Sequence, residues 1–259
     1  MRTFTHAIVR TISRSLANCE LTHLPRQPFD LGLAAQQHRG YVDALAATGI
    51  QMSVLPEDPA LPDAMFVEDT AIILNELIIV CRPGCASREP EVEKILPVLT
   101  SLGNLIKIQP PGTLDGGDVL VVDKTLFVGR SGRTNSEGLR QLEAATRAFG
   151  YRVVPVTIRG CLHLKTAVTC VAPGLLLANS HWVDLTPFAG FELLATPQSE
   201  PWSANTLPVN EVVLTLASSP RTIDLLQSKR LNIRPVDISE LQKAEAGLTC
   251  LSLLYRQRG

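Results

Sequence analysis

The segment 112–135, GTLDGGDVLVVDKTLFVGRSGRTN, combines three carboxylates, Asp115, Asp118 and Asp123, with Arg133 near its far end. Asp and Gly dominate turns because they tolerate unusual backbone angles, so turn chemistry is one explanation of the pattern. The other is a pocket for a ligand that carries both charges, because carboxylates bind cationic groups and arginines bind anionic ones.

Two side chains elsewhere could take part in covalent chemistry: Cys250 in LTCLSLLY and His163 in LHLKT. A thiolate is a good nucleophile, but a free thiol with a pKa of about 8.5 is mostly protonated at neutral pH. A histidine or a cationic substrate beside the sulfur would favour the thiolate. We expect LHLKT to end a strand in which His163 faces the opposite side from Leu162 and Leu164. A packed thiol and a structural histidine are the alternatives.

The carboxylates of Asp63, Glu68, Asp69 and Asp115 suit a guanidinium, which is planar, always charged and rich in forked N–H donors. A solvated turn is the alternative for the sequence FVED, and a divalent cation site is the alternative for the whole set. No Asp-x-Asp-x-Asp loop is present, so we expect no metal and no cofactor. Asp118, at the start of a strand, is expected to be structural.

Four stretches share one layout, in which a short turn joins two apolar strands, and this layout is typical of a β-hairpin. They read TAIILNELIIVC, DVLVVDKTLFVG, AVTCVAPGLLLA and NTLPVNEVVLTL. A polar residue leads into each first strand about every 40–50 residues, at Asp69, Asp118, Lys165 and Asn205. A fifth strand begins at Thr249, and the N-terminal strand THAIVR would complete its hairpin.

Predicted helices and further strands, NLIKIQ and YRVVPV, alternate with these hairpins. The predicted helices are 88–102, then 134–149, which opens with a capping-box pattern and turns Leu139, Leu142 and Phe149 inward, and one that starts at Ser219 and Pro220. We therefore expect the α/β class and five ββαβ units in a propeller closed by the two chain ends. A two-layer sandwich with extra helices is the alternative.

In a circular array, the residues that enter each first strand meet at one central mouth. These residues are Glu68, Asp69, 115–118, 163–165, Asn205 and Cys250. The acids of LDGGD would then lie opposite a histidine and a cysteine from other units, which favours the pocket explanation.

The composition narrows the class of protein. The 259 residues are 45% hydrophobic, enough for a sizeable core, and we expect a single domain over 1–259. The net charge of −1 and a pI near 6.5 argue against binding to nucleic acid. Because the sequence lacks a membrane-span pattern and a signal-peptide pattern, we expect a cytoplasmic protein. The six cysteines lack metal-binding spacing and are expected to be free thiols.

Six segments of the chain resemble the dimethylarginine dimethylaminohydrolases of the guanidino-modifying superfamily, in the order and spacing of that family. They are LPDAMFVED, CRPGCASR, TLDGGDVL, VGRSGRTN, LHLKT and GLTCLSLL. The resemblance runs from THAIVR to the C-terminus. It implies a pseudo-fivefold α/β propeller (pentein fold) and hydrolysis of Nω,Nω-dimethyl-L-arginine, and of monomethyl-L-arginine, to L-citrulline and an amine.

The resemblance also assigns roles to residues. Cys250 would be the nucleophile that forms a covalent thiouronium, and His163 would be the acid–base group. Asp115 would hold the substrate and the catalytic histidine. The implied substrate-binding residues are Asp63, Glu68 and Asp69 for the guanidinium, Arg88 and Arg133 for the α-carboxylate, the carbonyl of Ala244 for the α-amino group, and Leu21 in a lid.

One position departs from the family pattern. An Asp commonly stands five residues before the nucleophile, whereas this chain has Glu245. The extra methylene could reposition the carbonyl of Ala244. We expect this change to affect substrate preference rather than the class of reaction.

Two other functions stay open. One is an arginine deiminase or amidinotransferase with the same cysteine chemistry, although deiminases of this superfamily are usually much longer. The other is a non-catalytic module that binds methylated arginines. A metal-dependent amidohydrolase is disfavoured, because the sequence has no H-x-H motif. The expected partner is a small methylated arginine, and the expected state is a monomer or homodimer.

Overall fold

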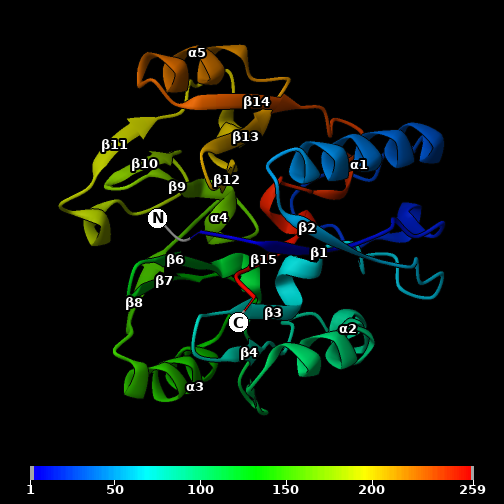
Figure 1. Cartoon of the computed structure of the whole chain (residues 1–259), viewed down its shortest axis with the longest axis vertical. Helices are drawn as coiled ribbons and strands as arrows, with labels where there is room; N and C mark the ends of the chain where they lie inside the picture. The colour runs from blue at the N-terminus through cyan, green and yellow to red at the C-terminus, as the bar shows by residue number, and fades with distance from the viewer. Residues whose placement is uncertain (1–2, 258–259) are drawn as a thin grey trace.

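Five three-stranded sheets repeat along the chain in the computed structural model, which describes residues 3–257 (Figure 1). In every sheet the middle strand pairs antiparallel with one neighbour and parallel with the other. The sheets are β15 (Leu253–Tyr255), β1 (His6–Arg10) and β2 (Gln51–Leu55); β3 (Ala71–Ile73), β4 (Ile78–Val80) and β5 (Leu105–Lys107); β6 (Val119–Val122), β7 (Thr125–Arg130) and β8 (Arg152–Thr157); β9 (Val168–Ala172), β10 (Leu175–Ala178) and β11 (Glu192–Ala195); and β12 (Leu207–Val209), β13 (Val212–Leu216) and β14 (Asn232–Val236).

All four predicted hairpins are present, and their turns explain why. Three of the turns place a residue in the left-handed region: Asp123 at φ 50°, Gly174 at φ 75° and Asn210 at φ 55°. Glycine has no Cβ, and Asp and Asn tolerate this conformation better than other residues do. The turn chemistry therefore fixes where each antiparallel pair reverses.

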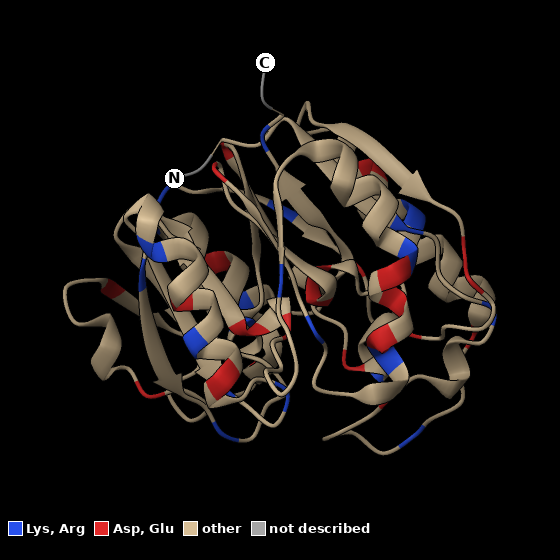
Figure 2. Cartoon of the chain, turned by 90° about the horizontal axis from the view of Figure 1, so that it is seen from below, with Lys and Arg blue, Asp and Glu red and all other residues tan. Residues whose placement is uncertain are grey.

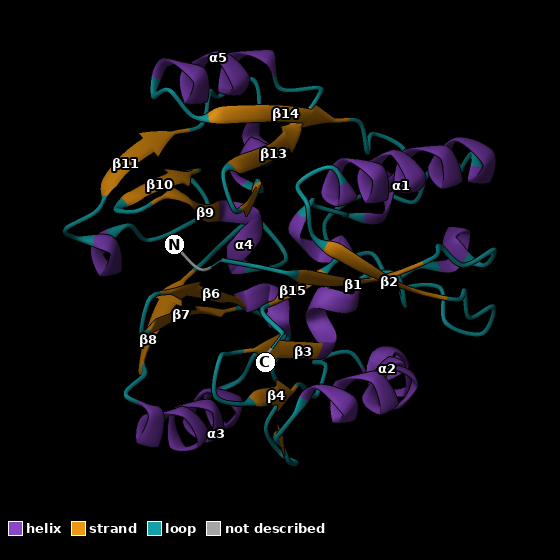
Figure 3. Cartoon of the chain, in the orientation of Figure 1, coloured by secondary structure: helices purple, strands orange, loops and turns teal. Residues whose placement is uncertain are grey.

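Helices on the outside of the ring of sheets connect the second and third strands of a unit, as Figure 3 shows. Parallel strands need such a crossover connection. The connecting helices are α1 (Leu31–Ala46), α2 (Glu89–Leu102), α3 (Ser136–Thr146) and α5 (Pro220–Ser228). Asp30 and Asn135 cap α1 and α3, because their side chains accept hydrogen bonds from the first-turn N–H groups of Leu33 and Gly138.

The prediction of a ββαβ unit repeated five times is wrong for the fourth unit, which lacks the α-helix. Its crossover contains the 3-10 turn Thr186–Phe188 in place of an α-helix. The ring of Phe188 is fully buried and packs on Phe127 with the ring centroids 4.6 Å apart. Phe188 therefore packs in one apolar cluster with residues of β7 and β10, and this crossover contributes to the core without an α-helix.

Two predicted boundaries also differ from the structure. Phe149 was predicted to face inward, but it is 41% exposed, because α3 ends at Thr146 and a 3-10 turn changes the direction of the chain. The fifth strand was predicted from Thr249, but it begins at Leu253, because Thr249–Leu251 form a 3-10 turn.

The two ends of the chain close the ring. Strand β15 pairs antiparallel with β1, with Ala7 opposite Leu254, as predicted. The hydroxyl of the buried Tyr41 of α1 donates a hydrogen bond to the carbonyl of Leu248 at 2.9 Å and can accept one from the hydroxyl of Ser252 at 2.8 Å. Because these two residues flank Cys250, the core of this unit fixes the position of the cysteine.

Acidic and basic residues are interspersed along the helices nearest the viewer in Figure 2, as expected for a chain with a net charge of −1. Within residues 3–257, none of the helices combines the length and the apolar character needed to cross a membrane.

Candidate active site

The segments that enter the first strands meet at the centre of the ring, as predicted, and hydrogen bonds join four of their side chains in a closed circuit. Lys165 Nζ donates to Glu68 Oε1 at 2.5 Å, and Glu68 Oε2 accepts from the hydroxyl of Thr249 at 2.8 Å. Asn205 Nδ2 donates to that same hydroxyl at 3.1 Å and to the carbonyl of Lys165 at 3.0 Å. These hydrogen bonds connect three units of the propeller with the turn that contains Cys250.

The two glycines of LDGGD permit close approach at this centre. A Cβ on Gly116 would lie 1.9 Å from the carbonyl oxygen of Glu68. A Cβ on Gly117 would lie 2.6 Å from His163 Nδ1 and 2.7 Å from Asp69 Oδ1. These positions need glycine because neighbouring groups occupy the space of a side chain.

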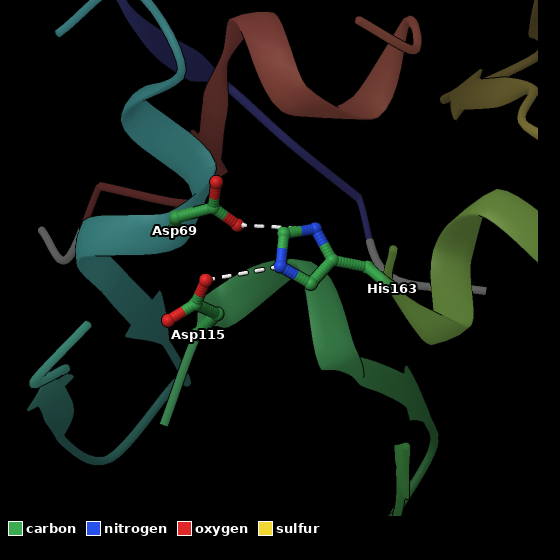
Figure 4. A group of neighbouring side chains, drawn as sticks. All are labelled: Asp69, Asp115 and His163. Carbon is green, nitrogen blue, oxygen red and sulfur yellow. Dashed lines mark hydrogen bonds and ion pairs between the residues drawn. The ribbon is translucent and has the colours of Figure 1, made fainter. Parts of the chain in front are cut away.

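The carboxylates of Asp69 and Asp115 both point toward the imidazole of His163, as Figure 4 shows. Asp115 Oδ2 lies 3.0 Å from His163 Nε2, at hydrogen-bond distance. Asp69 Oδ1 lies 3.7 Å from Nδ1, which is an ion-pair distance but longer than a hydrogen bond. Asp115 therefore fixes the ring and leaves Nδ1 as the nitrogen that is free to exchange a proton.

These carboxylates also set the charge of the imidazole. Burial alone would lower the pKa of His163, but the negative charge of Asp69, the hydrogen bond that Asp115 accepts and the charge of Asp118 outweigh burial and raise the pKa to about 9. The pKa of Asp69 falls to about 2, because His163 and Arg88 together outweigh the effect of its burial. At neutral pH the site therefore holds an imidazolium between carboxylates.

The backbone around His163 differs from the predicted strand end. His163 precedes the short helix α4 (Leu164–Ala167), and Leu162 lines the same cavity as the imidazole, so the predicted strand alternation is wrong. Asp118 explains the turn, because its Oδ1 accepts the N–H of Leu164 at 3.0 Å and its Oδ2 accepts the hydroxyl of Thr134 at 2.7 Å. The contacts of Asp118 agree with the structural role expected for it.

Cys250 lies in the 3-10 turn Thr249–Leu251 and is 8% exposed. Its sulfur accepts the backbone N–H of Gly247 at 3.4 Å. Burial and the charges of Glu68 and Asp69 raise the pKa of the thiol to about 12. Without a cation at the sulfur, the side chain is therefore a neutral thiol at physiological pH.

One cavity brings the sulfur and the imidazole together. Among the predicted residues, Cys250, His163, Asp63, Asp69, Arg88, Arg133 and Ala244 line it. Sequence reasoning missed Glu20, Phe66 and Leu162 in its wall and treated Glu245 only as a departure from the family pattern. Phe66 and Leu162 lie within the motifs LPDAMFVED and LHLKT, and Glu20 adjoins Leu21, but the direction of their side chains has no signal in the sequence.

Three predicted site residues have other positions. Asp115 is fully buried behind His163, and the side chain of Leu21 is half-buried and packs against the core beside α1. Glu68 faces a larger cavity at the opposite side of the circuit, together with Lys165. That larger cavity contains neither Cys250 nor His163 in its lining, so its size does not make it the reaction site.

Arg88 is a buried residue that positions Asp69. Its Nη1 donates to Asp69 Oδ2 at 2.7 Å, and its Nε and Nη2 donate to the two oxygens of Glu91 at 3.0 and 2.8 Å. The pKa of Glu91 is nevertheless raised to about 7, because its burial outweighs the charge of Arg88. The role of Arg88 as a ligand of a substrate carboxylate stays a prediction.

Arg133 differs from Arg88, because part of its guanidinium is unused. Its Nη2 donates to the hydroxyl of Thr22 at 3.1 Å, whereas the buried Nη1 has no hydrogen-bond partner. Thr22 belongs to the lid segment, residues 18–32. An unpaired N–H group of a cation in the cavity wall is suited to an anionic group of a ligand.

Asp63 also connects the cavity to the lid segment. Its Oδ2 accepts the backbone N–H of Glu20 at 3.0 Å, and Glu20 in turn accepts the hydroxyl of Ser87 at 2.6 Å. Burial raises the pKa of the Asp63 carboxyl, although the charge of Arg88 opposes this shift. Segment 18–32, the predicted lid, is thus hydrogen-bonded to a residue of the cavity wall.

A metal site was the alternative explanation of the acids. Within residues 3–257, one group of donor atoms lies close enough together to hold an ion, namely those of Asp69, Asp115 and His163, which are within 4.8 Å of one another. A metal-bound histidine must give up a proton. In the metal-free protein the same three side chains form an imidazolium paired with two carboxylates.

Comparisons with known proteins agree with this geometry. A family model described as N,N dimethylarginine dimethylhydrolase, eukaryotic, matches residues 30–184. The chain is 39% identical to the N(G),N(G)-dimethylarginine dimethylaminohydrolase of Streptomyces coelicolor over 254 residues, 97% of each chain. It is 34% identical to the enzyme of that name from Pseudomonas aeruginosa over 255 residues, 97% of this chain and 100% of the other.

Solved structures give the same picture and confirm the predicted pentein fold. A cysteine-to-serine mutant of the Pseudomonas aeruginosa enzyme in complex with citrulline matches with a TM-score of 0.94 at 34% identity, over 98% of this chain and 100% of the other. An amidinotransferase from Microseira wollei matches with a TM-score of 0.85 at 17% identity, over 99% and 95% of the two chains. The second match shows a shared fold only.

Proposed function

The chain belongs to the dimethylarginine dimethylaminohydrolase family, and we propose that it hydrolyses Nω,Nω-dimethyl-L-arginine, and monomethyl-L-arginine, to L-citrulline and dimethylamine or methylamine. The observation that carries this proposal is the single cavity that joins the thiol of Cys250, the imidazole of His163 and the carboxylates of Asp63 and Asp69. Two named relatives align with this chain over nearly their whole length.

The charges of the cavity suit the two ends of such a substrate. Asp63 and Asp69 supply carboxylates for the guanidinium, whose N–H groups match paired oxygen acceptors. The unpaired Nη1 of Arg133 is available for the α-carboxylate at the other end. A dimethylated guanidinium keeps its positive charge, so its methyl groups do not weaken the attraction of the carboxylates.

The bound cation also activates the nucleophile. The positive charge beside the sulfur stabilises the thiolate and lowers the pKa of Cys250, which burial otherwise raises to about 12. The thiolate attacks the central guanidinium carbon, and a carbon–sulfur bond forms. The imidazolium of His163 donates its Nδ1 proton to the departing dimethylamine as the carbon–nitrogen bond breaks, which leaves a thiouronium on Cys250.

Hydrolysis then reverses the proton transfer. His163, now neutral, accepts a proton from water, and the hydroxide attacks the thiouronium carbon. The carbon–sulfur bond breaks, and the departing sulfur takes up the remaining hydroxyl proton of the adduct. Neutral citrulline forms, and the site returns to the thiol and imidazolium of the free enzyme. Asp115 holds Nε2 at 3.0 Å through both steps, so the same nitrogen, Nδ1, acts first as an acid and then as a base.

A product assay tests the function. With dimethylarginine, monomethylarginine and arginine supplied side by side in the presence of a chelator, we expect equal amounts of citrulline and dimethylamine from the first substrate. Ammonia release from arginine as the main activity would identify a deiminase. Transfer of the carbon to a second amine would identify an amidinotransferase, and binding without any product would leave only a binding module.

The raised pKa values predict an unusual pH profile. Below about pH 9 the free enzyme holds a thiol and an imidazolium, one proton more than the reactive thiolate–imidazolium form. The value of kcat/KM should therefore rise about tenfold per pH unit up to about pH 9, as this extra proton is lost. Above pH 9 it should level off, because an enzyme with a thiol and a neutral imidazole carries the same number of protons as the reactive thiolate–imidazolium form. Steady-state kinetics between pH 6 and 10.5 measure this profile.

The Asp115→Asn variant serves as the check on this assignment. Loss of the Asp115 charge should shift the inflection of the kcat/KM profile to lower pH, because the hydrogen bond that Asp115 accepts from His163 helps to raise the pKa of His163. A profile that falls above pH 9 would contradict the order of the two pKa values.

A further inference from the structure

Glu245 has contacts that neither the reaction nor the fold requires. It follows the 3-10 turn Leu241–Ala244 and has a left-handed backbone with φ 58°, a conformation that residues with a Cβ seldom adopt. Glu245 lines the cavity next to Ala244.

One oxygen of this carboxylate holds the lid segment. Glu245 Oε1 accepts three consecutive backbone N–H groups, from Thr22 at 2.9 Å, His23 at 2.5 Å and Leu24 at 2.7 Å. Successive N–H groups that converge in this way form an anion-binding nest. The lid segment thus closes around a negative charge supplied from the other end of the chain.

The other oxygen is unused. Glu245 Oε2 is buried and has no hydrogen-bond partner. A buried polar atom without a partner is rare and loses the hydration that it had in water. A side chain that serves only as a clasp for the lid would not require this second oxygen to stay unpaired in the cavity wall.

Glu245 and Arg133 line the same cavity. Arg133 contacts the hydroxyl of Thr22, and Glu245 contacts the N–H of the same residue, so both charged groups adjoin one residue of the lid segment. Each has one buried, unpaired atom, Nη1 on the arginine and Oε2 on the glutamate. An α-amino acid offers a matching pair, because its carboxylate and its ammonium are attached to one carbon atom.

We propose that Glu245 is a specificity-determining residue whose Oε2 accepts a hydrogen bond from the α-ammonium group of the substrate while Oε1 holds the lid segment closed. The inference rests on the proposed function for the identity of the substrate. The preference for an α-amino acid as substrate and the closure of the lid segment over that substrate then depend on the same carboxylate. A guanidine without an α-ammonium group would leave Oε2 unpaired inside the closed cavity.

The test compares two ligands that differ only in the α-amino group. L-citrulline and 5-ureidopentanoic acid are titrated by calorimetry into the wild-type protein and into the Glu245→Gln variant. The glutamine oxygen can still accept the lid N–H groups, but its NH₂ group is neutral and cannot accept a hydrogen bond from an ammonium. We expect the wild type to prefer citrulline and the variant to lose about tenfold of that preference, the usual size of a charge-assisted hydrogen bond.

Glu211→Gln is the matched control, because Glu211 is an exposed residue of a hairpin turn. It should keep the full preference. If Glu245→Gln weakens both ligands equally or neither of them, Glu245 does not contact the α-ammonium and the inference is wrong. Because the readout is binding, a protein that discriminates between these ligands but releases no citrulline would overturn the proposed function and leave the inference intact.

Discussion

Replacement of Cys250 by serine is expected to lower citrulline formation by about 10⁴-fold or more, the scale seen when a covalent nucleophile is removed. The substrate cation can stabilise a thiolate whose pKa is about 12 in the ligand-free protein, but a serine hydroxyl is a much weaker acid. Serine would keep the contact with the N–H of Gly247 and nearly the same volume. Product release from dimethylarginine, followed by mass spectrometry, measures the loss.

The control is Cys170→Ser. Cys170 is a half-buried thiol on β9 whose pKa is raised to about 11 by burial, and it lines the larger cavity outside the reaction site. This variant should retain near wild-type turnover. Citrulline binding and the thermal unfolding midpoint show whether the Cys250→Ser variant is folded. A folded Cys250→Ser protein that keeps a few per cent of the activity would refute the nucleophile assignment.

The sequence predicted the fold well where the signals are local. The turn residues Asp123, Gly174 and Asn210 stand between apolar runs, and each forms the expected reversal. The prediction failed where tertiary packing determines the local structure. The fourth crossover buries Phe188 from a 3-10 turn, and the packing of an isolated aromatic side chain leaves no periodic pattern in the sequence.

The site was predictable in part for a similar reason. The circular arrangement brought the segments of Asp69, Asp115 and His163 together, and their contacts follow. The predicted arrangement did not determine the direction of each acidic side chain. Glu68 and Asp69 are adjacent in the sequence, yet Glu68 pairs with Lys165 at the larger cavity, whereas Asp69 faces the imidazole of His163.

The contacts of Glu245 show most clearly what the sequence could not predict. Its partner Leu24 lies 221 residues away in sequence, and the nest of three lid N–H groups is a backbone feature that no side chain marks. Only the assembled ring places that carboxylate under the lid segment. The resemblance to the family identified the position as unusual, but the contacts of the longer side chain are evident only in the folded structure.

Replacement of His163 by glycine is expected to lower kcat by about 10³-fold, within the range for loss of a general acid–base group. Dimethylamine would leave without a proton donor, and water would attack the thiouronium without a base. Rapid-quench kinetics should therefore show slow release of dimethylamine and, in mass spectra of the quenched protein, a covalent adduct on Cys250 that persists.

The glycine variant also leaves Asp69 and Asp115 buried without the imidazolium, and an uncompensated buried charge is strongly destabilising. His163→Asn provides a second variant with a polar side chain at this position. Added imidazole should restore part of the rate of the glycine variant, because its cavity can admit the ring, but should not help the asparagine variant. His181→Gly removes an exposed histidine and should change neither step. If either His163 variant is folded and turns over at the wild-type rate, the proton must come from another group, and the pairing of His163 with Asp115 would be structural only.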